Sequence, residues 1–360
     1  MRRLLAAAAA GLLLVLGTGA QAGAAEPGWQ VHNPPTTMDG WYTDQITAFG
    51  HDSAIALGTE YWIIGNHRTY KRVWQWGGQQ WTTLTLPSES LVPGAVTGVS
   101  ATDEWVFGRD DSGGATRFPG YRWNGGRWTE QGSKDFEVLA AQSKSASDLW
   151  AAGSDRGDGF FHPQVGHWNG SSWSVTRTPV PAGYSGSLTA VHAVSATNVW
   201  AAGSISADVA NAKSEPYLVH WDGTSWTRAA LPGFTEDVRL TSVLVRANGE
   251  VWAGGYQSKY VPGKAIVLRG TAQGFGLVPV PDTGDTRLTG FAEDGGTLYA
   301  GIGGSGDTTN GLLSWTGSGW QTATGPTAPT RRVGVLTAVP GGGLWAGGAD
   351  KSGKQFLALR

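Results

Sequence analysis

Short apolar stretches separated by turn-forming residues recur along the whole chain. The clearest example lies near its middle, where residues 188–194 are apolar enough for a strand buried on both faces and 199–204 form a second apolar run. After a polar stretch, residues 217–221 alternate, the sequence DGTS turns the chain, and 226–230 continue beyond it. This pattern predicts four short antiparallel strands and no helix.

The same unit recurs at a nearly constant interval, marked by an aromatic residue that glycine follows within three positions. The aromatic residues are Trp62, Trp105, Trp150, Trp200, Trp252, Tyr299 and Trp345, which gives steps of 43, 45, 50, 52, 47 and 46 residues. A period of 40 to 50 residues carried by aromatics and glycines is typical of β-propeller blades. The sequence therefore predicts an all-β protein, a seven-bladed β-propeller with four antiparallel strands per blade.

The two ends of the chain complement each other. The last unit, from about Val333 to Arg360, has room for only three strands, whereas residues 28–35 (GWQVHNPP) resemble the fourth-strand sequence that begins at Gly319. We expect the N-terminal strand to complete the last blade and close the ring, which removes free sheet edges.

The amino-acid composition limits the kinds of ligand and chemistry that the protein can have. Charged residues make up 15% of the chain and the net charge is −2, so the basic surface that nucleic acid requires is not expected. The chain has no cysteine, which excludes disulfides and thiolate chemistry. It has 19 tryptophans, and we expect most of them to pack one blade against the next, with Trp41 and Trp74 outside the repeat positions and freer.

The first residues have the features of a secretory signal. Arg2 and Arg3 precede an apolar run over residues 4–16, which is too short to span a bilayer, and small residues end at Ala22. We expect a signal peptide over 1–22, a single propeller domain over 23–360, and a secreted, extracellular protein without membrane insertion. A bacterial source fits an exported chain that lacks disulfides.

Two groups of proteins have similar repeats. The glycine-ended second strand and the Trp221-Asp222 pair resemble the kelch-type repeat, and the unit VSATNVWAAGS followed by VHWDGTSW resembles repeats of secreted actinobacterial propeller proteins. A looser similarity connects the chain to tectonin-type propeller lectins. The resemblance covers residues 28–360 and implies a propeller fold, which hosts many unrelated functions.

Specificity is expected in the loops between the second and third strands, because these loops vary while the scaffold repeats. They lie on the same face of a propeller as the connections between blades. The stretch 155–162 is the sharpest candidate, since its two adjacent phenylalanines have no evident core to enter. The candidate binding residues are His67, Arg68, Tyr70, Asp110, Asp111, Arg117, Phe118, Asp155, Asp158, Phe160, Phe161, His162, Lys259 and Tyr260.

The sequence has no catalytic or metal motif. It lacks a GxSxG elbow, a phosphate loop and a dinucleotide fingerprint, and its aspartates do not have the alternating spacing of a calcium loop. The prediction is a non-enzymatic, monomeric, lectin-like protein without cofactor or metal, which recognises a glycan or a cell-surface ligand. Two alternatives stay open: an adaptor for a protein partner in an extracellular assembly, and a polysaccharide lyase or hydrolase whose site is assembled from several blades.

Overall fold

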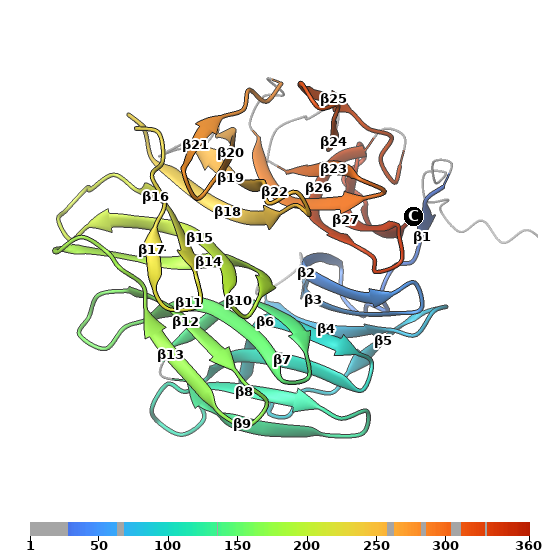
Figure 1. Cartoon of the computed structure of the whole chain (residues 1–360). Coiled ribbons are helices and arrows are strands. Elements are labelled where there is room, and N and C mark those ends of the chain that lie inside the picture. Colours follow the sequence, from blue (N-terminus) through green and yellow to red (C-terminus); the bar gives the residue numbers. More distant parts are fainter. Residues whose placement is uncertain are drawn as a thin grey trace, which may run out of the picture.

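Seven antiparallel sheets of four strands each contain the named strands of the computed structural model (Figure 1). The structure describes residues 28–62, 68–134, 136–257, 263–281, 286–303, 311–327 and 330–360. The predicted all-β, seven-bladed propeller is confirmed. No helix in these ranges is long and apolar enough to cross a membrane.

Each blade begins with the strand nearest the axis of the ring. These innermost strands are β2 (Gly40–Gly50), β6 (Leu91–Ser100), β10 (Glu137–Ser145), β14 (Tyr184–Ser195), β18 (Val238–Val245), β22 (Arg287–Asp294) and β26 (Thr330–Ala338). The second strands are β3 (Ser53–Tyr61), β7 (Asp103–Asp110), β11 (Asp148–Asp155), β15 (Asn198–Ala207), β19 (Val251–Gln257), β23 (Thr297–Gly303) and β27 (Leu344–Asp350). Each innermost strand contacts the innermost strand of the next blade, all the way round the ring.

The two outer strands of each blade form a hairpin. The third strands are β4 (Thr69–Trp76), β8 (Phe118–Trp123), β12 (His162–Trp168), β16 (Glu215–Trp221), β20 (Lys264–Thr271), β24 (Leu312–Trp315) and β28 (Gln355–Leu359). The outermost strands are β5 (Trp81–Leu84), β9 (Trp128–Lys134), β13 (Trp173–Arg177), β17 (Trp226–Arg228), β21 (Gly274–Leu277), β25 (Trp320–Thr322) and β1 (Gln30–Val31).

The N-terminal strand closes the ring, as expected. In the seventh blade the strand order is β1-β28-β27-β26, with Gln30 opposite Leu359. Beside this pair, the Trp29 indole is buried and donates from Nε1 to the carbonyl of Thr324 in the sixth blade at 3.1 Å. The Arg360 guanidinium lies over the Trp29 ring at 5.3 Å, so both ends of the chain contribute to one interface.

Paired indoles hold the blades together, as the repeat predicted. Trp105 of the second blade packs against Trp168 and Trp173 of the third, with ring centroids 5.5 and 5.8 Å apart. Three other interfaces repeat this arrangement, in which a second-strand tryptophan meets the hairpin pair of the next blade: Trp150 with Trp221 and Trp226, Trp252 with Trp315 and Trp320, and Trp345 with Trp76 and Trp81.

The first blade departs from the prediction. Its second strand is Ser53–Tyr61, so Ile55 stands where five other blades have tryptophan and the sixth has Tyr299, and Trp62 follows the strand with 41% of its surface exposed. Trp62 is therefore not a repeat mark. Trp74 is fully buried rather than free, because its ring fills the space above Gly58 of the neighbouring strand.

All seven innermost strands contain a β-bulge at the same position. The bulged residues are Asp44, Gly94, Leu139, Thr189, Thr241, Thr289 and Gly334. In most blades the bulge brings a carbonyl of the inner strand onto a glycine of the second strand. A Cβ at Gly203, for example, would lie 1.9 Å from the carbonyl oxygen of Ser187. This close approach explains the glycine that marks the repeat.

The bulged threonines also bond to the next blade. Thr189 Oγ1 donates to the carbonyl of Leu240 at 2.9 Å, and Thr241 Oγ1 donates to that of Leu288 at 2.8 Å. Thr289 continues the series with Val333 of the seventh blade. The hydroxyls therefore join blades four to seven near the axis.

Glu104 differs from the other buried acids because its carboxyl group is unpartnered in the described structure. Glu104 of β7 is fully buried, and its carboxyl oxygens have no hydrogen-bond partner among the described residues. The neighbouring Gln75 amide donates instead to the carbonyl of Ala101 at 2.8 Å. Burial raises the pKa of Glu104 to about 8, so the group is protonated at neutral pH.

Candidate binding surface at the mouth of the ring

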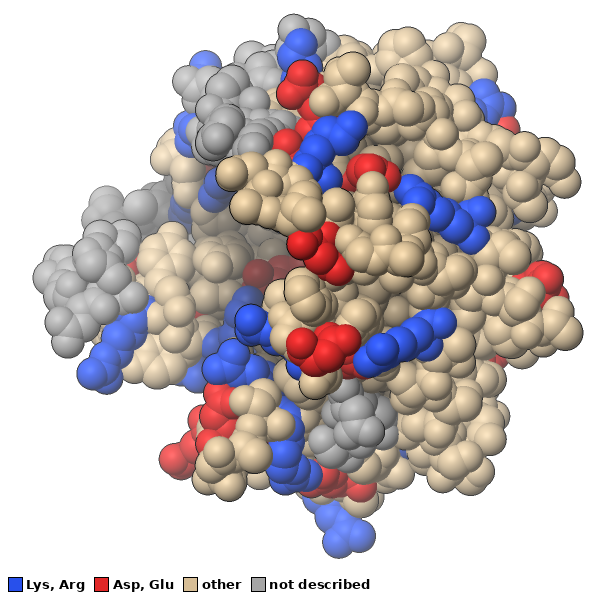
Figure 2. Space-filling model, turned by 90° about the vertical axis from the view of Figure 1, so that its left-hand side faces the viewer, with Lys and Arg blue, Asp and Glu red and all other residues tan. Residues whose placement is uncertain are grey.

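The chain path places one set of loops on one face, which we call the loop face. Every innermost strand begins on this face, every second strand ends there, and the loops between the second and third strands lie there as well. Figure 2 looks onto the left-hand side of Figure 1 and shows a hollowed surface with basic and acidic side chains around the hollow. The loop face therefore joins the variable loops to the entrance of the ring.

Seven equivalent residues surround this entrance, one from each blade, and we call them the mouth positions. Each stands two residues before the bulge of its innermost strand. They are Tyr42, Val92, Glu137, Ser187, Arg239, Arg287 and Arg332. Blades five, six and seven thus present three successive arginines, whereas the only acid in this set, Glu137, belongs to the third blade.

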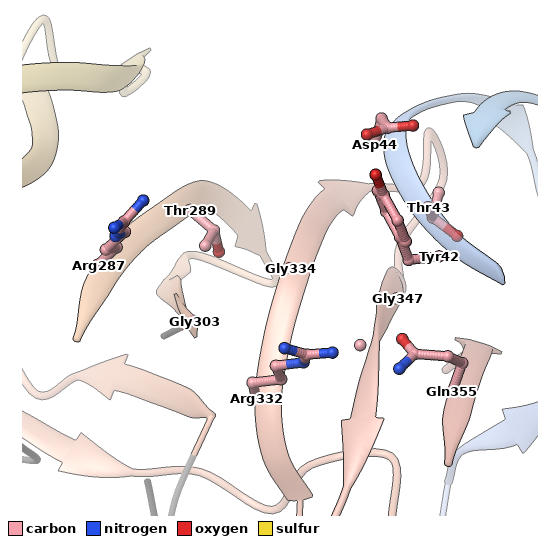
Figure 3. Close-up of a pocket in the computed structure, with 11 residues that line it drawn as sticks. Tyr42, Thr43, Asp44, Arg287, Thr289, Gly303, Arg332, Gly334, Gly347 and Gln355 are labelled. Atoms are coloured by element: carbon pink, nitrogen blue, oxygen red, sulfur yellow. The ribbon is translucent and has the colours of Figure 1, made fainter. Parts of the chain in front are cut away.

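A cavity of about 550 Å³ opens between blades six, seven and one. Arg287, Arg332 and Tyr42 line it from three mouth positions. Figure 3 shows Arg332 and Gln355 pointing toward one another and the Tyr42 hydroxyl directed toward Asp44. The Asp44 carboxylate is already engaged, because it accepts from Lys71 Nζ at 3.0 Å.

A smaller cavity of about 250 Å³ lies at blades three to five. Six serines line it, together with Phe161, Glu137 and Arg239; the serines are Ser154, Ser185, Ser187, Ser204, Ser206 and Ser214. Phe161 is 43% exposed, and its backbone carbonyl accepts from the Gly186 amide at 2.7 Å. The loop that carries the ring is therefore anchored to the fourth blade, while the ring itself is open to solvent.

The loop 155–162 splits the predicted residues into two roles. Asp155 is buried and pairs with Arg177 at 2.8 Å, so it holds the base of the loop. Asp158 accepts from His162 Nε2 at 2.8 Å, an interaction that lowers the pKa of the Asp158 carboxyl. Phe160, with 46% of its surface exposed, stands beside Phe161 at the tip.

The charged candidates of the second blade, Asp110, Asp111 and Arg117, are paired with residues of the same blade. Asp110 is buried, and hydrogen bonds from the backbone of Ser112 and from Ser90 lower its pKa to about 2. Asp111 pairs with Arg109 at 2.7 Å, and Arg117 pairs with Glu130. These interactions hold the loop in place. They also use most of the hydrogen-bonding groups that these side chains could offer to a ligand.

The remaining candidates lie elsewhere. Tyr70 lines a groove of about 660 Å³ between blades one and two, which reaches the mouth position Val92. Arg68 is exposed just before β4, and Phe118 is half-buried at the start of β8. The expected signal peptide over 1–22 and the candidates His67, Lys259 and Tyr260 are outside the described residues.

The mouth arginines were missed from the sequence, although a signal for them exists. Arg239, Arg287 and Arg332 each stand directly before the apolar residue that precedes the bulge, in the sequences VRLTSV, TRLTGF and RRVGVL. Aligning the blades on the bulge brings the three arginines into one column. No group of three or more potential metal ligands occurs in the described ranges.

Comparison with known proteins supports the propeller fold, but it does not identify a family or a specific function. No protein-family model matches the chain, kelch and tectonin models included, and no curated protein matches it. Among solved structures, the WD40 β-propeller domain of Doa1 is similar with a TM-score of 0.58 and 13% identity, over 92% of this chain and 97% of that one.

Two polysaccharide-active enzymes share the architecture. Polysaccharide lyase Uly1 has a TM-score of 0.55 and 10% identity, with 91% of each chain covered. A xyloglucanase from Xanthomonas campestris has a TM-score of 0.56 and 14% identity, over 92% of this chain and 55% of that one. At these identities the likeness concerns the fold alone.

Proposed function

We propose that the protein is exported and binds glycans, without chemistry, through the loop face of its propeller. The observation that carries this proposal is the exposed Phe161 ring beside a cavity lined with serine hydroxyls. A sugar presents an apolar ring face and a rim of hydroxyls, so it needs a flat apolar surface next to small polar groups. The arrangement at Phe161 offers both.

The scaffold suits such a role. The Phe161 carbonyl accepts a hydrogen bond from the Gly186 amide, which fixes the backbone that carries the ring, and the Arg156 guanidinium lies over the ring at 5.0 Å. A ring held in place loses little conformational freedom when a ligand stacks on it. The surface around it is open and shallow, which fits a saccharide chain better than an enclosed small molecule.

The test is a glycan array with the purified protein, followed by titration of the best ligand against Phe161→Ala. Loss of the ring should weaken binding roughly tenfold, because truncating an interfacial aromatic costs more than about 1 kcal/mol. Leu277→Ala is the matched control, since Leu277 is 53% exposed on the outermost strand β21, and it should bind like the wild type.

An array without any binding overturns the proposal, as does equal binding by the two variants. A protein recovered in fixed proportion from culture supernatant, together with a silent array, would support the adaptor alternative. Shortening of a bound polysaccharide during the titration would support the enzyme alternative.

A further inference from the structure

From the mouth positions we infer that the protein prefers acidic glycans, and that Arg239, Arg287 and Arg332 form a subsite for their carboxylate or sulfate groups. This inference rests on the proposed function and names the class of sugar that it concerns. The subsite begins with Arg239 at the cavity that holds Phe161 and continues away from it through Arg287 and Arg332.

The three arginines form one continuous basic arc. Arg287 and Arg332 line the same cavity. Arg239 pairs in register with Tyr256, and the Arg287 guanidinium lies over that same ring at 4.6 Å from its centroid. Tyr256 therefore lies between the first two arginines, and the cavity lies between the second and the third.

No acid in the described part of the chain is paired with this arc. Among the residues that the structure describes, none of the three arginines makes an ion pair, whereas Arg72, Arg122 and Arg177 all do. Asp44, the acid that lines the cavity, is paired with Lys71. Glu137 of the third blade lines the serine cavity together with Arg239, and it makes no ion pair with that arginine. Like charges in successive blades repel one another, so a bound anion relieves that repulsion.

The chemistry of the arc selects its ligand. A guanidinium donates two parallel hydrogen bonds to a carboxylate or a sulfate, and arginines on rigid strands keep this geometry. Tyr42, with 41% of its surface exposed at the next mouth position, supplies an aromatic face beside the arc. A sugar that bears an acidic group can stack there while its anion reaches Arg332.

The arc also connects with the serine cavity. Arg239 lines that cavity together with Phe161 and Ser187. A saccharide chain that stacks on Phe161 would cross the mouth past Arg239 before it reaches Arg287. The surface therefore fits a polymer with acidic groups better than a single sugar.

The experiment measures binding of the purified protein to three polymers of similar length: a polyuronate, a sulfated galactan and neutral dextran. The acidic polymers should bind at least tenfold more tightly than dextran at low salt. A stronger response to polyuronate or to the galactan identifies carboxylate or sulfate as the natural anion. Arg287→Gln and Arg332→Gln should each weaken acidic binding roughly tenfold or more, since hydrogen bonds to charged groups are the stronger ones. Binding to any neutral glycan should change less than twofold.

Two control variants distinguish general attraction by positive charge from specific binding at the basic arc. Arg127→Gln removes an exposed arginine from the hairpin between β8 and β9, on the opposite face, and should leave acidic binding unchanged. Arg287→Lys keeps the charge but loses the paired hydrogen bonds, so it should restore only part of the affinity. The melting temperature of each variant reports that the fold is intact.

The outcomes are distinguishable. If neutral glycans bind and acidic ones have no advantage, or if Arg287→Gln behaves like Arg127→Gln, the basic arc is refuted while the proposed function stands. Equal affinity for a single-stranded nucleic acid of the same length would show attraction of any polyanion and would also refute the acidic-sugar subsite. If no glycan of either kind binds, both proposals fall.

Discussion

Ring closure can be tested at a single side chain, Trp29. Its indole is 3% exposed and packs in one cluster with Ala292 and Leu312 of the sixth blade, although Trp29 itself precedes the strand that completes the seventh. If the closing strand holds the ring together, Trp29→Ala should destabilise the whole propeller and not merely loosen one end of the chain.

The size of the effect follows from burial. Replacing a buried tryptophan by alanine costs about 3–5 kcal/mol, and this range includes the lost hydrogen bond from Nε1 to Thr324. For a domain of about 330 residues, the usual unfolding entropy per residue converts this loss into a drop in Tm of roughly 4–7 °C.

The assay is thermal unfolding followed by circular dichroism, with Trp62→Ala as the matched control. Trp62 is 41% exposed after β3, so its removal should change Tm by less than about 1 °C. The prediction is refuted if Trp29→Ala and Trp62→Ala have the same Tm, or if the Tm of Trp29→Ala equals that of the wild type. Either result would mean that the N-terminal strand contributes nothing to closure.

Three further predictions concern the scaffold. Gly203→Ala forces a Cβ against the Ser187 carbonyl and should cost at least about 1–3 kcal/mol, whereas Gly276→Ala, with no neighbouring atom within 4 Å, should be neutral by the same melting assay. Thr241→Val removes the hydroxyl bond to Leu288 and should cost about 1 kcal/mol in urea unfolding; an unchanged midpoint would contradict a role in joining blades. The folded pKa of Glu104, about 8, lies above the ordinary value of 4.5, so the folded state binds the extra proton and stability should fall as pH rises between these values, by up to roughly 1.4 kcal/mol per pH unit. Glu104→Gln should remove this slope and melt above the wild type at pH 8; parallel curves for the two proteins would refute it.

Much of the fold could be predicted because every blade uses a similar arrangement of four strands, and most interfaces between blades are packed by the same kinds of residue. The hairpin pair Trp168 and Trp173 recurs as Trp221 and Trp226, since each interface must bury the same kind of surface. The first blade escaped the pattern because Ile55 stands at the tryptophan position and packs with Val96 and Val106 of the second blade, so an aliphatic cluster replaces the indoles at this interface.

The candidate site was harder to predict. Loop residues such as Asp110 were singled out for their charge, yet their hydrogen-bond partners are local and become visible only once the loop is folded. Arg287 was overlooked because a single residue in a strand looks like ordinary variation. Its meaning depends on Arg239 and Arg332, which come close to it only because the innermost strands of successive blades pack side by side.

The bulge in the innermost strands has a consequence for how new specificities arise. At most mouth positions the scaffold makes use of the backbone carbonyl, as where the Ser187 carbonyl lies over Gly203, and the side chain stays outside the core. Tyr42, Glu137 and Arg332 can therefore occupy the same place without altering the blade around it. Single substitutions at the seven mouth positions can therefore change ligand recognition, in evolution or in a randomised library, with little loss of fold stability.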